Sequence, residues 1–261
     1  MILIGIVVLA TSIWFFDVFG KTPDDYMHVL PTPLQHFAPN LYITYKSRAH
    51  VPEKVWDGLR RFAPGYTVRF FDDAACESYI ASHFHGDVLA RYRQLRKGAH
   101  RADLFRYCVL WREGGLYLDI KTELLRPLPD LSREHNATVL SKVKHTIYQG
   151  WLWIPRAGDP IIGKCLRHVV SSKQRLVDSS FMQIVTHRVG YLMFTSAMFR
   201  FIQEQQGGAE LVVGKNGSWH LFQERCGCAG GAVRDRYGLC CSIYDADGSE
   251  LARTRYSDYP W

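Results

Sequence analysis

From residue 40 onward, the pattern of hydrophobic and polar positions alternates between strand-like and helix-like segments. Leu41–Tyr45 (LYITY) and Thr67–Phe71 (TVRFF) are typical of short strands. Between them, Pro52 begins a segment with apolar residues at helical spacing, which Pro64 and Gly65 end. A strand, a helix and a second strand in so short a span predict βαβ units. We therefore expect an α/β fold with a mixed, mostly parallel sheet flanked by helices.

The same alternation continues through the middle of the chain. Asp72 and Asp73 are suited to cap the next predicted helix. A longer helix is predicted over Ala99–Glu113, and Gly114-Gly115 would end it because glycine accepts left-handed backbone conformations. Leu116–Ile120 then reads as a buried strand with Asp119 near its carboxyl end. Ligands of open α/β sheets bind at that end of the strands, so a site is expected there.

The amino terminus carries an uncharged apolar run, MILIGIVVLATSIWFF, over residues 1–16. At about 1.5 Å per residue, this run is shorter than a hydrocarbon core of roughly 30 Å unless the residues up to Gly20 join it. We interpret residues 1–20 as a signal-anchor or a signal peptide, with a buried core segment as the alternative. The proline-rich residues 21–39 then form a stem or linker, and residues 40–261 form the folded domain.

The carboxyl-terminal part predicts a β-hairpin. Two turn signals, RDRYG and DADG, punctuate short strands predicted at Cys240–Tyr244 and Glu250–Arg255. Four of the seven cysteines are close to this hairpin: Cys226, Cys228, Cys240 and Cys241. One or two disulfides across it would fit an oxidising compartment. Zinc is the alternative, although the spacing lacks the C-x₂-C pairs that are typical of structural zinc sites.

Composition narrows the class of protein. With 47% hydrophobic and 22% charged residues, the chain has the apolar content of a globular protein, which excludes intrinsic disorder. A mean hydropathy of −0.14 and a single long apolar run exclude a polytopic membrane protein. The net charge of +7 suggests an anionic partner. A nucleic acid is not expected, because basic and aromatic residues are not interleaved beyond the stretch 91–101.

The segment Gly98–Pro127 carries the most informative set of polar residues. Asp103 and Arg106 are three residues apart on the predicted helix, so they share one face. A carboxylate accepts hydrogen bonds and a guanidinium donates them in a fixed geometry, so together they can read the stereochemistry of sugar hydroxyls. The alternative is an intrahelical salt bridge without a ligand.

This segment resembles the DXD-containing sugar transferases related to the initiation-specific α-1,6-mannosyltransferase and, more distantly, the clostridial glucosylating toxins. The resemblance rests on R-A-D-x-x-R-Y followed by G-G-x-Y-L-D. It implies a Rossmann-like GT-A fold and a glycosyltransferase that transfers a hexose from a UDP- or GDP-sugar with retention of configuration. It further implies that Asp103 and Arg106 bind hydroxyls of the donor hexose, and that Asp119 contacts the nucleotide ribose and the metal shell.

The sequence departs from the family motif at its second aspartate, where Asp119-Ile120-Lys121 replaces D-x-D. Two carboxylates at this spacing would face one Mn²⁺ or Mg²⁺ ion, whereas an ammonium removes an oxygen ligand and repels the metal. Three outcomes are open. Lys121 neutralises the leaving diphosphate; Glu123 supplies the missing oxygen beside Asp119, if the strand continues that far; or the protein is a catalytically silent relative that binds carbohydrate or nucleotide.

A later loop, Gly214–His220 (GKNGSWH), resembles the carboxyl-terminal S-W element of the family. The resemblance implies that Ser218 offers its hydroxyl to phosphate or metal and that Trp219 covers the donor. A core position for Trp219 is the alternative. His83 and His85 are interpreted as a helix-end pair rather than a site.

These features together predict a lumenal glycosyltransferase anchored in the Golgi or endoplasmic reticulum membrane by its amino-terminal segment. The resemblance implies a glycan or a glycolipid as the acceptor.

Overall fold

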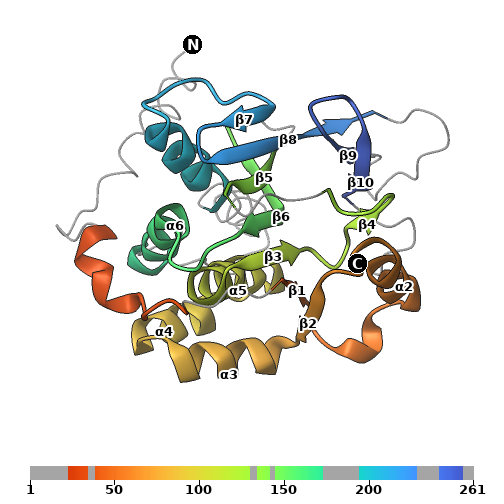
Figure 1. The fold of residues 1–261 in the computed structure, drawn as a ribbon. Coiled ribbons are helices and arrows are strands. Elements are labelled where there is room, and N and C mark those ends of the chain that lie inside the picture. The colour runs from red at the N-terminus through yellow and green to blue at the C-terminus, as the bar shows by residue number, and fades with distance from the viewer. Residues whose placement is uncertain are drawn as a thin grey trace, which may run out of the picture.

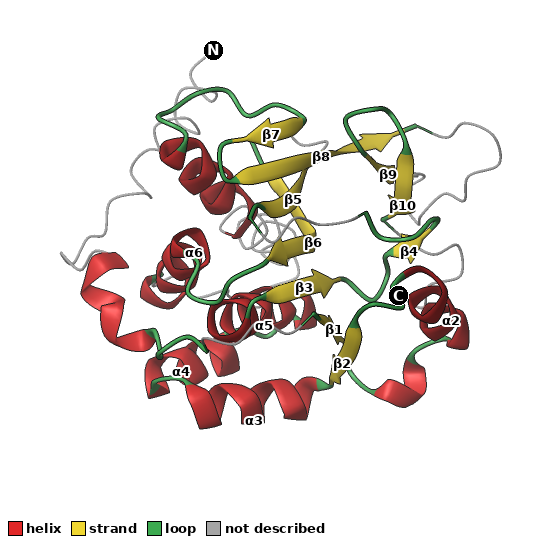
Figure 2. Ribbon diagram, viewed as in Figure 1, coloured by secondary structure: helices red, strands yellow, loops and turns green. Residues whose placement is uncertain are grey.

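A mixed ten-stranded β-sheet organises the protein (Figures 1 and 2). The computed structural model describes residues 23–34, 39–129, 134–141, 145–172, 194–227 and 241–254. The strand order is β2-β1-β3-β6-β5-β8-β9-β10-β4, and β7 pairs with β8. The strands are β1 (Asn40–Thr44), β2 (Thr67–Phe71), β3 (Gly115–Leu118), β4 (Glu123–Leu124), β5 (Asn136–Leu140), β6 (Ile147–Ile154), β7 (Gly214–Asn216), β8 (Trp219–Cys226), β9 (Cys241–Tyr244) and β10 (Glu250–Arg253).

The sheet is less parallel than the sequence predicts. Among the described strands, β1 pairs in parallel with β2 and β3, and β5 pairs in parallel with β8. The other six pairs are antiparallel. The expected α/β fold and mixed sheet are therefore correct, but the expectation that most of the sheet is parallel is wrong. The chain returns from β5 to β6 over only 141–146, and so short a connection joins antiparallel strands.

Helices cover both faces of the sheet. The helical elements are α2 (Glu53–Phe62), α3 (Asp73–His83), α4 (Gly86–Gln94), α5 (Gly98–Glu113), α6 (Pro160–Ser171), the 3₁₀ turns η1 (Pro23–Val29) and η2 (Arg48–His50), and a helix over residues 194–205. In β3, Tyr117 packs into the core with α3–α6, whereas Leu116 and Leu118 pack into the core with α2. Burial on both faces explains why the central strands are apolar throughout.

Two glycines join α5 directly to β3. Gly114 and Gly115 have φ values of +68° and +103°. A Cβ atom on Gly114 would lie 2.9 Å from the carbonyl oxygen of Ile154, and one on Gly115 would lie 2.8 Å from that of Asn40. Only glycine fits both the backbone conformation and the space. The predicted helix is confirmed, and the strand ends at Leu118, so that Asp119 follows its last residue.

The described part of the expected stem packs on the domain. η1 lies against α6, the side chain of Val29 is fully buried, and the Leu34 amide donates to the carbonyl oxygen of Arg112 at 2.7 Å. The linker interpretation therefore does not hold for residues 23–34. No helix in the described ranges has the length and apolarity to cross a bilayer. The apolar run 1–16 lies outside the described residues.

The expected carboxyl-terminal hairpin is confirmed. β9 and β10 pair antiparallel around the turn at 245–249, and β10 also pairs with β4. A disulfide between Cys226 and Cys241 joins β8 to β9, with 4.1 Å between the Cα atoms. One of the expected disulfides is thus present, while Cys228 and Cys240 lie outside the described residues.

Candidate functional site

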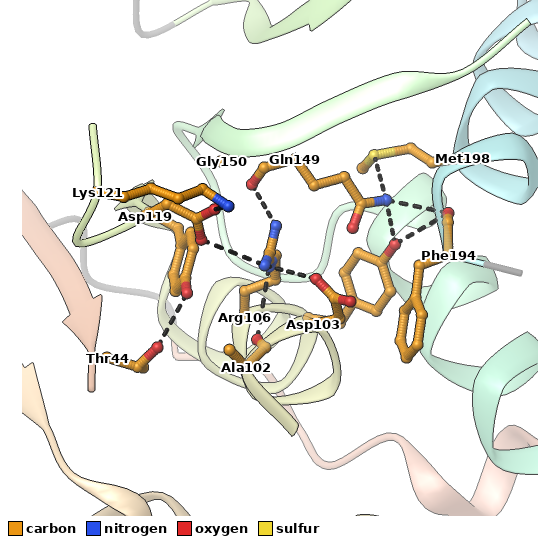
Figure 3. A network of polar contacts seen from close by, with 12 residues as sticks. Thr44, Ala102, Asp103, Arg106, Asp119, Lys121, Gln149, Gly150, Phe194 and Met198 are labelled. Atoms are coloured by element: carbon orange, nitrogen blue, oxygen red, sulfur yellow. Dashed lines mark hydrogen bonds and ion pairs between the residues drawn. The ribbon is translucent and has the colours of Figure 1, made fainter. Parts of the chain in front are cut away.

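Four charged side chains meet where β3 ends (Figure 3). Asp103 and Arg106 come from α5, while Asp119 and Lys121 come from the turn that follows β3. The Asp119 amide donates to the carbonyl oxygen of Gly150 at 2.9 Å, which holds the start of this turn against β6. The sequence analysis expects a ligand site at the carboxyl end of this strand, and the four charged side chains lie there.

Arg106 lies at the centre of the cluster. Its Nη2 is 2.6 Å from Oδ1 of Asp103 and 3.5 Å from Oδ1 of Asp119, and its Nη1 donates to the carbonyl oxygen of Gln149. The guanidinium also lies over the Tyr117 ring, 4.5 Å from the centroid. Only 4% of the side chain is exposed. The guanidinium therefore fixes both carboxylates relative to the sheet and leaves itself little surface for a ligand.

Lys121 occupies the position of the missing second aspartate. Its Nζ lies 3.0 Å from Oδ2 of Asp119. The Lys121 side chain is 30% exposed, and the side chains of Asp103 and Asp119 are each 17% exposed. These three side chains, unlike that of Arg106, keep part of their polar surface open to a ligand.

The two carboxyl groups have opposite pKa shifts. Burial raises the pKa of Asp103 to about 6; the charge of Asp119 adds to this effect, while Arg106 opposes it. Burial would also raise the pKa of Asp119, but the positive charges of Lys121 and Arg106 together outweigh it and hold that pKa below its ordinary value. At neutral pH Asp119 is therefore firmly ionised, whereas Asp103 changes charge only slightly below neutrality.

Glu123 does not complete a metal site with Asp119. The strand does not continue as that expectation required, because β3 ends at Leu118 and a turn separates it from β4. The Glu123 carboxylate instead accepts a hydrogen bond from Arg253 at 3.2 Å. Within the described ranges, no group of three or more His, Cys, Asp or Glu ligands includes Asp119.

The charges at this position also disfavour a divalent metal. Both carboxylate oxygens of Asp119 already face cationic groups. Unit charges 4 Å apart near a protein surface interact by about 4 kcal/mol, so a divalent cation would gain about 8 kcal/mol from Asp119 at that distance and lose about as much to Lys121. The residues present therefore do not fit the Mn²⁺ or Mg²⁺ that a D-x-D motif would hold.

Ser218 and Trp219 lie at another level of the sheet. Trp219 pairs with Asn136. The next residue, Ala137, pairs with Trp153, which in turn pairs with Leu116 near the start of β3. Trp219 is therefore level with the start of β3 and not with its end. The Trp219 side chain is fully buried, and its indole N–H donates to Oε1 of Gln205 at 3.1 Å. Trp219 is therefore a core residue, and the expectation that it covers the donor is wrong. Ser218 is exposed beside it, away from Asp119.

Gln149 is a site residue that sequence reasoning missed. Its carbonyl oxygen accepts a hydrogen bond from Arg106. Its side chain donates to the hydroxyl of Tyr107 and, at 3.0 Å, to the carbonyl oxygen of Phe194. Gln149 is only 3% exposed. The available signal was a single amide within the otherwise apolar and aromatic strand IYQGWLWI. Buried polar groups of this kind normally have a specific hydrogen-bonding role.

Comparisons with known proteins found similarity to glycosyltransferases. Residues 53–138 match the family "Glycosyltransferase sugar-binding region containing DXD motif", and this range includes all four charged residues of the cluster. The chain is 30% identical over 94 residues to the initiation-specific alpha-1,6-mannosyltransferase of Candida albicans, which covers 35% of this chain and 22% of that protein. It superposes on the PaToxG glycosyltransferase with a TM-score of 0.48 and 16% identity, over 78% of each chain. Residues 53–138 therefore match the family that the sequence motif resembles.

Proposed function

We propose that the protein transfers a hexose from a UDP- or GDP-sugar to a glycan or glycolipid, because residues 53–138 match the sugar-binding region of the DXD glycosyltransferases. The convergence of Asp103, Arg106, Asp119 and Lys121 at the end of β3 carries this proposal. The parallel β2-β1-β3 unit at the amino-terminal side of the sheet supports a GT-A-like arrangement.

The proposed role of each residue in the cluster follows from the exposure of its side chain. Asp103 and Asp119 present partly exposed carboxylates, which accept hydrogen bonds from hydroxyls of the donor hexose and ribose. Arg106 is buried and engaged by both carboxylates, so it acts as a positioning residue. This role differs from the direct sugar contact that the family resemblance implies for Arg106.

Lys121 supplies the positive charge for the leaving group. As the bond between the anomeric carbon and the diphosphate oxygen breaks, negative charge develops on the diphosphate, and the ammonium stabilises it. The acceptor hydroxyl attacks the anomeric carbon from the face that the diphosphate leaves, and its proton passes to a leaving phosphate oxygen. This order retains the anomeric configuration and needs no covalent enzyme intermediate.

We further place the protein in the lumen of the secretory pathway, held at the Golgi or endoplasmic reticulum membrane by residues 1–20. The Cys226–Cys241 disulfide supports an oxidising compartment. The uncharged apolar run at the amino terminus supports membrane attachment.

A donor screen tests the proposed activity. Purified protein is incubated with UDP-glucose, UDP-galactose or GDP-mannose, with Mn²⁺ or with EDTA, and release of the nucleoside diphosphate is measured. We expect one donor to be turned over, and turnover to persist in EDTA. Saturable donor binding without turnover under every condition would contradict the proposal and would identify a silent sugar-nucleotide-binding relative.

The role of Lys121 is tested by substitution. Lys121→Ala should lower kcat by about a hundredfold to a thousandfold, the range found when one charge-stabilising group is removed from an active site. Lys121→Asp restores the D-x-D pattern and should make turnover depend on Mn²⁺. Lys215→Asp, at an exposed position of β7, makes the same charge change and is the control. An unchanged metal response in Lys121→Asp would show that Lys121 does not act on the diphosphate.

A further inference from the structure

Outside the proposed active site, two histidines and an aspartate form a compact group on the helical side of the protein. His28 lies in η1, and His85 and Asp87 lie at the start of α4, more than fifty residues further along the chain. Their ligand atoms all lie within 4.8 Å of one another. In Figure 1, α4 is at the lower left of the molecule, whereas β3 ends near its middle, so this group is separate from the end of β3.

The distances within this group suit a tetrahedral metal ion. Nε2 of His28 lies 3.0 Å from Oδ2 of Asp87, and Nδ1 of His85 lies 3.5 Å from the same oxygen. A tetrahedral Zn²⁺ ion with bonds of about 2.0–2.1 Å separates neighbouring ligand atoms by roughly 3.3 Å. The two observed separations bracket that value. Two imidazoles and one carboxylate also form a donor set that zinc commonly takes in proteins.

One ligand atom of the group already has a weak partner. Nδ1 of His85 accepts a long hydrogen bond of 3.3 Å from the Asp87 amide, and zinc would replace this contact because it needs the same lone pair. The rings of His28 and His85 meet edge to face, with 4.8 Å between their centroids. All three side chains are about half exposed, and a cavity of about 420 Å³ that His28 and Asp87 help to line leaves room for a water molecule as fourth ligand.

We propose that His28, His85 and Asp87 bind one zinc ion, which fastens the amino-terminal segment carrying η1 to helix α4. Its role is structural, because the ion would cross-link two segments that are distant in sequence. Without the ion, the side chains through which they meet here are half exposed. Such a cross-link stabilises the folded chain because the ligands are assembled only when the chain is folded. The site is independent of the sugar-transfer proposal.

A zinc titration tests this site directly. Untagged full-length protein, stripped with EDTA, is titrated with Zn²⁺ against a chromogenic chelator, and its Tm is measured with and without Zn²⁺. We expect one ion per chain and a higher Tm in zinc. His28→Ala and His85→Ala should each weaken zinc binding at least a hundredfold and abolish the Tm increase, since losing even an outer-shell partner costs about tenfold to a hundredfold.

His83 offers a matched control two residues from His85. Its ring packs edge to face against Tyr79, with 4.7 Å between the ring centroids, and it does not belong to the group. His83→Ala should leave zinc affinity unchanged. Three results would overturn the site: no zinc binding by the full-length chain, binding that His28→Ala and His85→Ala leave intact, or an equal loss in His83→Ala. Because none of these measurements involves a sugar donor, they stand or fail separately from the transferase activity.

Discussion

The two ends of helix α5 carry two acidic clusters of opposite character. At its carboxyl end, Glu113 accepts hydrogen bonds from the hydroxyls of Tyr42 at 3.0 Å and Tyr79 at 2.6 Å, and it also accepts one from Arg69. The Glu113 side chain is only 9% exposed. Towards the amino end, the Asp103 carboxylate shares Arg106 with Asp119 and keeps 17% of its side chain exposed.

The difference lies in what satisfies each carboxylate. Burial raises the pKa values of Tyr42 and Tyr79 well above the ordinary tyrosine value, so both phenols remain protonated donors to Glu113. The Glu113 carboxylate itself is enclosed, although Arg69 is 35% exposed, and it ties α5 to β1 and α3. The Asp103–Asp119 cluster is held by cations, one of which is partly exposed, so an incoming ligand has groups to bind. An Asp or Glu paired with an Arg can therefore bind a ligand only where part of the carboxylate remains exposed.

The largest effect that would test this contrast is on activity. Asp119→Asn and Asp103→Asn keep the size of each side chain but remove the charge, and each should lower donor turnover about a thousandfold, near the upper range for one stabilising group. Glu113→Gln, at the other end of the helix, should change turnover by less than about tenfold. Turnover by each folded variant, checked by circular dichroism, measures the difference. Full activity in Asp103→Asn would contradict the proposed site.

The second effect is on stability and has the opposite distribution. Glu113→Ala removes the acceptor of two buried hydroxyls and leaves Arg69 without its buried partner. Each buried hydroxyl left without its acceptor costs about 1–3 kcal/mol, so the two together should cost about 2–6 kcal/mol of unfolding free energy. Urea denaturation should show a loss of this size for Glu113→Ala and a smaller loss for Asp103→Ala, because Arg106 keeps Asp119 as a partner. Equal losses of unfolding free energy would mean that the two carboxylates contribute equally to stability, which would contradict the contrast.

The smallest effect concerns pH. Because the pKa of Asp103 is raised to about 6, its ionised acceptor form is lost below that pH, and kcat/KM should fall up to about tenfold per pH unit there. The stability effect has the opposite sign. A raised folded-state pKa contributes stability that is present below the ordinary carboxyl value and is lost as the pH rises through about 6.

Activity and this stability contribution should therefore change in opposite directions between pH 7 and 5. Parallel pH profiles of kcat/KM and of unfolding free energy measure both. Asp103→Asn, which cannot titrate, should lose the stability change near pH 6. An activity profile that falls only near pH 4 would assign the titration to another group.

Local features of the fold were predictable because they depend on neighbouring residues. β2 matches its predicted bounds, and Asp72 caps α3 by accepting a hydrogen bond from the Ala75 amide at 2.8 Å. The direction of β6 was not predictable, since it depends on which strands become neighbours across the sheet. The burial of Val29 was missed for the same reason, because its partners on α6 lie more than a hundred residues away.

The candidate site divides in the same way. Asp103 and Arg106 follow from helical spacing, and Asp119 follows from its place at the end of an apolar strand. The S-W element at Ser218 and Trp219 resembles a functional motif, but strand register places it at the level where β3 begins. Short motifs leave register undetermined, because register depends on pairing with distant strands.

The pairing of β4 with β10 has a consequence for how the site is completed during synthesis. β4 begins two residues after Lys121, and it is only two residues long. It is secured by β10, by a bond from the Leu125 amide to Leu251 and by the Glu123–Arg253 contact. A nascent chain can form the Asp103–Arg106 contact early. The turn that carries the lysine, however, gains its downstream anchor only after the ribosome has added more than a hundred further residues.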